Sequence, residues 1–329
     1  MKYVEMHFGF SQGPGARGTG ASREPKSASI GNTSRDRIGS ATFANEVRHS
    51  LDNCGVRTKI MWVIDSLCTD EESKANIHKN FEEVMGLIDD VPVLMSNQGV
   101  ENLKALCKKA KTKPIKLEEF VKEVFEEGIH HGAMALFGRM VASDPTLNTI
   151  SAVMNSHAIG VVPSTKTKDF FTAVDDFSVG TGASHTGWQE FCSPVMYRYS
   201  ALDCSQLLTN VKNNREIYKA GASMWATKNF LANPKAKQTG MATPTIPDFT
   251  LIVIGEGQPI SLFPAFIDPI TTNNVMEEMI DRMVKYHNKV RKITGFKHVS
   301  AYLTTTDFAG VGSKLETLND LSKFIADNI

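Results

Sequence analysis

The sequence predicts an α+β protein whose sheet-based core is interrupted by a helical insertion and by a long β-hairpin. Three observations carry this prediction. Strand-like and helix-like segments alternate along most of the 329 residues. Apolar residues follow helical spacing between about residues 62 and 128. The segment 164–191 follows a proline, has a glycine-rich centre and carries aromatic residues at both ends.

The first core elements are a strand and a helix. Every second position of the first strand is apolar, which is the period of a half-buried strand over residues 2–10: Val4, Met6, Phe8 and Phe10. A glycine-rich basic segment follows, and its composition fits either a disordered linker or a loop that holds phosphates. Ser40 then predicts the N-cap of a helix, "ATFANEVRHSL", with apolar residues on one face.

The second half of the chain continues the alternation. We predict a strand at "SPVMYRYSALD", a helix over 205–229, a strand at "DFTLIVIGEG", a helix at "NNVMEEMIDRMVKYHNKVRKI", a strand at "KHVSAYLTT" and a closing helix at "SKLETLNDLSKFIADN". Without the two insertions, strands and helices alternate through four pairs. This order is compatible with a ferredoxin-like core, or one like the RNA-recognition motif (RRM).

The two insertions divide the chain. Residues 62–128 predict an all-helical insert, acidic on balance, which on its own is typical of a solvated helical subdomain without chemistry. Residues 164–191 predict the hairpin. The core is then built from residues 1–61, 129–163 and 192–329.

Composition excludes several classes of protein. A formal net charge of zero means that any binding to nucleic acid depends on local charge separation. The five cysteines form no C-x-x-C pair, which argues against a disulfide framework or a zinc site. The N-terminus is too polar for a signal peptide, and no apolar run approaches a membrane span. We expect a soluble, cytoplasmic protein without a membrane partner.

Motifs for catalysis are weak. The sequence has no G-x-S-x-G, and "GPGARGTG" fits neither a Walker A loop nor G-x-G-x-x-G. His130 and His131 are adjacent and point different ways on a helix, and the neighbours Asp175 and Asp176 face opposite sides of a strand. We therefore expect no catalytic residues, no metal and no cofactor.

Motifs for nucleic-acid binding are stronger. Basic residues gather in the first sixty positions: Arg17, Arg23, Lys26, Arg35, Arg37, Arg48, Arg57 and Lys59. A locally basic face on a neutral protein suits contact with a phosphate backbone. Phe170, Phe171 and Trp188 in the hairpin either stack on bases or pack the hairpin onto the core, and the sequence leaves both alternatives open.

Several blocks, in order, resemble CasC, the CRISPR RNA (crRNA)-binding backbone subunit of type I-E CRISPR Cascade. They are "REPKSASIGNTSRDRIGSATFANEVRHSL", "GVRTK", "ALFGRMVASDPTLN", "SHAI", "DFFTAVDDF", "GWQEFCSPVMYRYSALDCSQL" and "KAKQTGMATPTIPDFTLIVI". The resemblance covers nearly the whole chain. It implies an RRM-like palm, a helical fingers insert and a thumb hairpin, in a non-enzymatic subunit that polymerises along a guide RNA.

The resemblance also implies partners and site residues. The partners are crRNA, the target DNA strand paired to it, further copies of the chain, and the large, small, crRNA 5′-end-binding and crRNA-processing endoribonuclease subunits. Phe170, Phe171 and Thr172 match the thumb positions that fold over a displaced base. The matched RNA-binding positions are Lys26, Arg35, Arg37, Ser40, Arg48, Arg57, Arg139, Met140, Lys237, Gln238 and Thr239.

The chain departs from the family pattern in its N-terminal segment. "GPGARGTGASR" stands where the family has N-R-D-D, the S-S-Q triplet is Gly39-Ser40-Ala41, and Gly31-Asn32 replaces a glycine pair. The chain therefore resembles a divergent member.

Two other functions remain as alternatives. One is a metal-dependent RNA-cleaving backbone subunit, as in type III effectors, for which Asp36, Asp175 and Asp176 are the candidate acids. The other is a general single-stranded nucleic-acid-binding protein.

Overall fold

The computed structural model describes residues 1–16, 20, 24–52, 54–68, 70–86, 92–126, 132–174 and 183–329. These form two compact units. The sheet unit comprises Met1–Val47, Asn155–Ala201 and Ala226–Ile329, and the helical unit comprises Arg48–Met154 and Leu202–Trp225. The predicted α+β class is confirmed, and the sequence-based positions that fall outside the described residues are Arg17, Arg23, His130, His131, Asp175 and Asp176.

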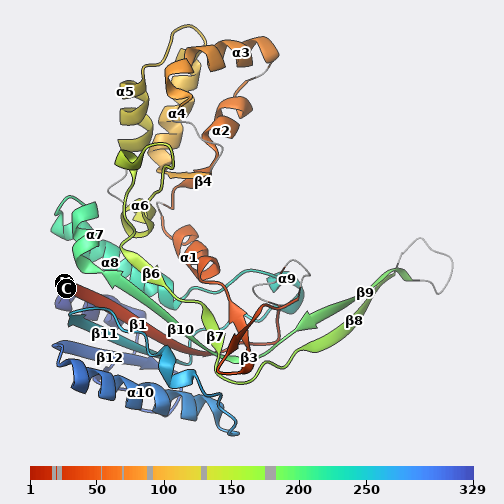
Figure 1. Cartoon of the computed structure of the whole chain (residues 1–329), viewed down its shortest axis with the longest axis vertical. Helices are drawn as coiled ribbons and strands as arrows, with labels where there is room; N and C mark the ends of the chain where they lie inside the picture. The colour runs from red at the N-terminus through yellow and green to blue at the C-terminus, as the bar shows by residue number, and fades with distance from the viewer. Residues whose placement is uncertain are drawn as a thin grey trace. The chain divides into compact units, whose positions relative to one another are not determined.

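A mixed sheet forms the centre of the sheet unit (Figure 1). Its strands lie in the order β13-β12-β11-β1-β10-β7-β3-β2. Neighbours β1, β11 and β12 are antiparallel, whereas β12 and β13 are parallel. The strands are β1 Lys2–Ser11, β2 Ser27–Ile30, β3 Thr33–Ile38, β6 Val153–Asn155, β7 Ala158–Gly160, β10 Val195–Asp203, β11 Phe249–Glu256, β12 His298–Thr304 and β13 Ser313–Lys314.

The first strand is buried on both faces, so the prediction of a half-buried strand is wrong. Residues 4–10 are all buried. The polar members of the second face have internal partners, because Glu5 pairs with Arg291 and His7 Nδ1 lies 3.0 Å from the Tyr197 hydroxyl. The alternation of apolar and polar residues along β1 therefore gives the strand one apolar buried face and one polar buried face.

The helices of the sheet unit agree with the prediction at α1, α10 and α11, and one predicted helix is broken. The predicted helix 205–229 is two helices, because Lys212 and Asn213 adopt left-handed φ values of 51° and 60° between them. The helices are α1 Ser40–His49, α9 Gln238–Met241, the 3₁₀ turn η4 Phe263–Phe266, α10 Val275–Thr294 and α11 Leu318–Asn328. Helix α8, Arg215–Phe230, belongs to the helical unit up to Trp225 and to the sheet unit from Ala226. Apolar residues of β10, β11 and α10 form the main buried cluster.

The basic N-terminal segment contains a hairpin that the sequence analysis missed. Strands β2 and β3 pair in antiparallel register from Ser27 with Asp36 to Ile30 with Thr33. Gly31 and Asn32 turn the chain with φ values of 54° and 62°. Two successive positive φ values are the geometry of the tight type I′ hairpin turn, which glycine and asparagine tolerate best. Residues 27–38 are therefore neither a linker nor an irregular loop.

Two paired strands lie within the predicted hairpin segment 164–191, of which the structure describes residues 164–174 and 183–191. Strand β8, Thr167–Val174, pairs with β9, Ala183–Phe191, and Phe170 lies opposite Trp188.

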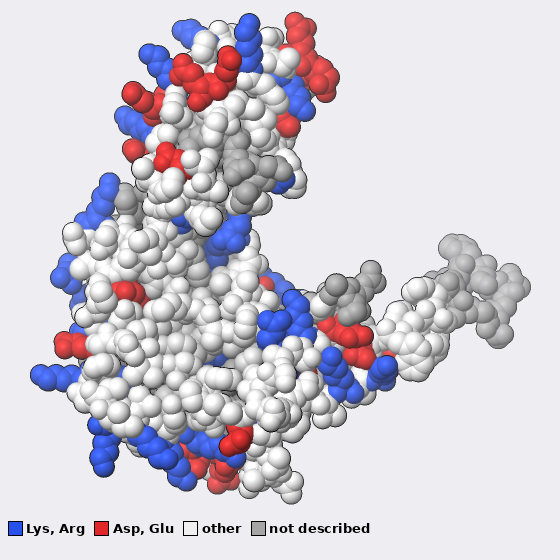
Figure 2. All heavy atoms as spheres, in the orientation of Figure 1, with Lys and Arg blue, Asp and Glu red and all other residues white. Residues whose placement is uncertain are grey.

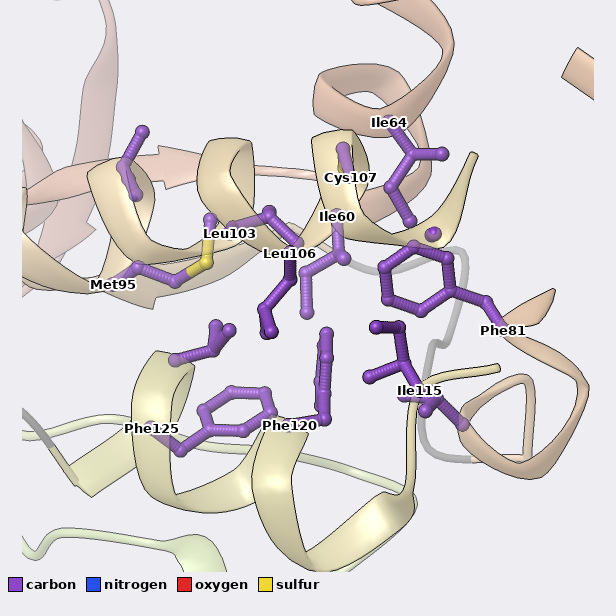
Figure 3. Packing of buried hydrophobic residues seen from close by; sticks show 14 of the residues in the cluster. Ile60, Ile64, Phe81, Met95, Leu103, Leu106, Cys107, Ile115, Phe120 and Phe125 are labelled. Atoms are coloured by element: carbon purple, nitrogen blue, oxygen red, sulfur yellow. The ribbon is translucent and has the colours of Figure 1, made fainter. Parts of the chain in front are cut away.

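The helical unit has its own apolar core (Figure 3). Phe120 contacts Phe81 and Phe125 edge to face, with ring centroids 6.0 and 5.7 Å apart. The expected all-helical insert is wrong in one detail, because β5 Val93–Met95 lies within it and pairs with β4 Val56–Thr58. The other elements are α2 Ile60–Ser66, α3 Glu71–Asn80, η1 Glu82–Val84, α4 Asn97–Ala110, α5 Leu117–Phe120, the π-helix η2 Val121–Glu126, α6 Gly132–Phe137, η3 Pro145–Leu147 and α7 Cys204–Asn210.

Among the described residues, none of the helices combines the length and the apolar character needed to cross a membrane.

Candidate nucleic-acid interface

Three of the predicted RNA-binding residues lie together where β3 leads into α1. Arg37 is at the end of β3, and its backbone N–H donates to the Lys26 carbonyl over 2.8 Å. Ser40 begins α1, and its backbone N–H donates to His157 Nδ1 over 2.8 Å. Arg37 Nη1 lies 3.4 Å from His157 Nε2. We call Lys26, Arg37, Ser40 and His157 the β3–α1 cluster.

The electrostatics of this cluster are positive. The pKa of His157 lies below its usual value, first because the ring is partly desolvated and then because Arg37 and Lys26 repel a further positive charge. The imidazole is therefore neutral at pH 7. In the view of Figure 2, lysine and arginine side chains gather around β3 and the base of the β8–β9 hairpin, with some acidic side chains beside them.

Arg35, two residues before Arg37, is fully buried. Its guanidinium donates to the carbonyls of Gly160 and Ile267 over 3.1 and 2.9 Å. Its neighbour Asp36 is also buried and accepts a hydrogen bond from Ser164 Oγ over 2.7 Å, and desolvation raises the pKa of that carboxyl. Both side chains therefore have partners inside the sheet unit.

Arg48 and Arg139, both in the helical unit, are also internal. Arg48 Nη1 donates to the carbonyls of Cys54 and Gly55 over 3.1 and 3.3 Å. Arg139 donates to the carbonyls of Phe125 and Leu147 over 2.8 and 2.7 Å, and burial lowers its pKa to about 10. With Arg35, these are three predicted RNA contacts whose guanidinium groups face protein carbonyls.

The neighbour of Arg139 behaves differently. Met140 is 72% exposed. It lines a pocket of about 510 Å³ in the helical unit, together with Arg57, Leu94 and Phe137. An exposed methionine beside a cation and apolar side chains forms a surface suited to the face of a nucleobase.

The hairpin exposes its aromatic side chains. Phe170 and Trp188 are 51% and 70% exposed, and their ring centroids lie 5.1 Å apart across the strand pair. Phe171 is also exposed, as is Thr172. Of the two alternatives for these aromatics, the structure therefore favours a surface available for stacking over packing onto the core.

One pocket is lined by residues of the hairpin and by Lys237, one of the predicted RNA-binding positions. It has a volume of about 680 Å³, and Lys168, Phe171, Trp188 and Lys237 are among its lining residues. Lys237 adopts a left-handed φ of 55° immediately before α9, which contains Gln238 and Thr239. The lining also includes Glu24 and Glu190, and Lys168 lies 3.7 Å from Glu190, so the two lysines are balanced by two carboxylates. The two aromatic rings offer surfaces for bases.

His157 and Lys168 lie beside predicted site residues but were not among the predicted positions. His157 lies in the quoted "SHAI" block, but a single histidine in an irregular segment gives no sequence signal for a contact with Ser40. Across the described ranges, we find no group of three or more His, Cys, Asp or Glu side chains placed to hold a metal ion.

Comparisons with known proteins agree over nearly the whole chain. Residues 21–326 match the model of a family described as "CT1975-like protein". One solved chain, from a "CRISPR RNA-guided surveillance complex, pre-nicking", is 20% identical with a TM-score of 0.87, covering 99% of this chain and 100% of that chain. Another, from a "CRISPR RNA-guided surveillance complex", is 18% identical with a TM-score of 0.68 and the same coverage. No curated protein sequence matches the chain.

Proposed function

The chain belongs to the CT1975-like protein family, and we propose that it is a guide-RNA-binding backbone subunit of a CRISPR RNA-guided surveillance complex. The resemblance to CasC-like backbone subunits is confirmed by the family match and by the fold shared with subunits of such complexes. The observation that carries the proposed function is the fold match over 99% of the chain with a TM-score of 0.87.

We propose the finer assignment to a type I-E Cascade, with an RRM-like palm, helical fingers and a thumb hairpin. The strand order β11-β1-β10-β7, with α1 after β1 and α8 after β10, supports a ferredoxin-like palm. The domain boundaries at 62–128 and 164–191 remain predictions. The subunit is proposed to act in the cytoplasm and to be non-enzymatic.

The proposed RNA interface divides the predicted residues into two groups. Lys26, Arg37, Ser40, Arg57, Met140, Lys237, Gln238 and Thr239 contact the RNA. Arg35, Arg48 and Arg139 shape the protein backbone beneath it, because their guanidinium groups already donate to carbonyls. Phosphate contacts of this kind give salt-sensitive binding with little sequence preference.

The hairpin is proposed as the thumb. Phe170, Phe171 and Thr172 would fold over a base of the guide bound by a neighbouring copy, and the bases between thumbs would pair with target DNA. The exposed rings of Phe170 and Trp188 support this role. The proposed partners are crRNA, target DNA, further copies and the other Cascade subunits.

Co-purification tests this function. The protein is isolated from cells that carry the neighbouring genes and a CRISPR array, and the bound RNA is extracted and sequenced. Uniform repeat-spacer-repeat RNAs of one length are expected. Heterogeneous RNA would favour a general single-strand-binding protein, and the absence of RNA would contradict the proposal.

A second assay addresses the RNA-cleaving alternative. The assembly is incubated with complementary RNA in a buffer that contains Mg²⁺. We expect the RNA to remain intact, and its cleavage would favour the type III-like function.

A further inference from the structure

The hydrogen bonds around His157 fix its tautomer. The backbone N–H of Ser40 is only a donor, so His157 Nδ1, 2.8 Å away, must be the acceptor. A neutral imidazole that accepts at Nδ1 carries its proton on Nε2. His157 therefore presents an N–H donor on the side away from Ser40.

This donor faces a second donor. Arg37 Nη1 lies 3.4 Å from His157 Nε2. A guanidinium has no acceptor atom, so the two groups cannot hydrogen-bond to each other while Nδ1 accepts from Ser40. An oxygen atom that accepts from both would resolve this arrangement.

The charges and the backbone suit an anionic acceptor. Arg37 and Lys26 are the charged groups that act on the ring, and both are positive. Arg37 is held by its backbone N–H bond to Lys26, and its strand pairs with β7, where Arg37 lies opposite Ile159. Since His157 is two residues before Ile159, one stretch of sheet fixes the positions of both side chains.

We propose that His157 is an RNA-binding residue, and that its Nε2–H, the Arg37 guanidinium and the Lys26 ammonium hold one phosphate group of the bound RNA. This inference rests on the proposed function and adds a residue to it. The neutral imidazole of His157 already carries a proton on Nε2, so it can donate at pH 7 without becoming an imidazolium. Arg37 and Lys26 supply the positive charge. Hydrogen bonds of this kind to an ionised oxygen are about twice as strong as neutral ones.

The alternative is that His157 only caps the start of α1. Two substitutions separate the two roles because each keeps one nitrogen's function. His157→Asn keeps an acceptor near the Nδ1 position and loses the distal donor. His157→Gln keeps a distal N–H donor and loses the acceptor for Ser40. Binding of the full-length chain to a fluorescein-labelled oligouridylate is measured by anisotropy, and thermal stability is measured in parallel.

We expect His157→Asn to weaken RNA binding about tenfold, the usual loss for one hydrogen bond to a charged group, and to leave thermal stability unchanged. His157→Gln should lower thermal stability and retain most of the binding. In a His157→Asn, Arg37→Gln double variant, the loss should be smaller than the product of the two single losses, because both side chains share one phosphate.

Each opposite result has a defined meaning. If His157→Asn binds like the wild type, or if the two losses multiply fully, the inference is overturned. If the wild type itself fails to bind the oligouridylate, the proposed function is overturned and the inference with it. Inorganic phosphate serves as the other probe: if it shifts the His157 imidazole NMR resonances and RNA does not, the site belongs to free phosphate and the RNA assignment is overturned.

Discussion

The same residue types have opposite surroundings in the helical core and in the β8–β9 hairpin. Phe81, Phe120 and Phe125 are fully buried, and Phe120 contacts each of the other two edge to face. Phe170 and Trp188 also contact one another, yet both remain more than half exposed. An aromatic pair in a two-stranded hairpin has no second layer to cover it.

The two regions differ in the source of their folding stability. The helical unit buries its rings within itself, so its free energy of folding comes from its own packing. An isolated two-stranded hairpin is marginal in water. The exposed rings of this hairpin therefore stabilise it little unless a partner covers them. This agrees with the proposed thumb, which would fold over a base.

The largest effect is expected from breaking the helical core. Phe120→Ala should lower the free energy of unfolding by about 3–5 kcal/mol, because it removes a fully buried ring and leaves a cavity. Phe170→Ala is the matched control and should cost less than about 1 kcal/mol. Urea denaturation followed by circular dichroism measures both, and equal losses would contradict the comparison.

The next effect separates a buried from a partly exposed arginine. Arg35→Met should cost about 2–3 kcal/mol, because the carbonyls of Gly160 and Ile267 lose their donors. Arg37→Glu should leave the melting temperature nearly unchanged, weaken RNA binding and flatten its salt dependence. Lys26→Glu should act as Arg37→Glu does. Equal loss of folding in all three variants would argue against the assignment of Arg37 and Lys26 to phosphates.

The buried polar face of β1 predicts a pH dependence. Burial lowers the pKa of His7 well below 6.5 and that of His287 to about 4, so both rings are neutral in the folded protein. Between pH 6.5 and 4 the unfolded chain binds more protons at these two rings, so their contribution to stability falls as the pH falls, by up to about 1.4 kcal/mol per pH unit for each ring. Burial raises the pKa of Glu5 on the same face, and that carboxyl contributes in the opposite direction. His287→Phe should reduce this slope in denaturation curves collected across that range. An unchanged slope would show that His287 does not titrate on unfolding.

The smallest effect on folding is expected for the hairpin itself. Replacing residues 166–188 by a glycine-serine segment should leave the free energy of unfolding nearly unchanged, because the hairpin buries little apolar surface. Ordered assembly on RNA should be lost, as seen by electron microscopy. Regular filaments in this variant would mean that the hairpin does not space the subunits.

The sequence predicted the elements that have a strong period. Strands β10 and β11, helix α10 and the hairpin follow from long apolar or alternating runs. Strand β7 was not predicted, because its three residues, Ala-Ile-Gly, are too few to show a period. The break between α7 and α8 was not predicted either, because a lysine in the sequence does not indicate that its backbone adopts a left-handed φ, as Lys212 does.

The site shows a physical limit of the same kind. Arg35 and Arg37 are two residues apart on β3, and a strand period of two places both on the same face. Arg35 is nevertheless covered by the chain at Phe266 and Ile267, whereas Arg37 reaches His157 near the surface. The sequence around β3 cannot show that Arg35 is buried and Arg37 is not, because the burial of Arg35 depends on a segment more than two hundred residues away.

The position of β1 in the sheet has a consequence for synthesis on the ribosome. β1 pairs with the whole of β11, from Lys2 with Glu256 to Gly9 with Phe249. At about 5–20 residues per second, the ribosome needs on the order of tens of seconds to make the intervening chain. During that interval most of the helical unit, Arg48–Met154, has already emerged. The first strand still has an unpaired backbone edge and an uncovered apolar face. A nascent chain of this topology therefore needs protection for its first ten residues until its last third has been translated.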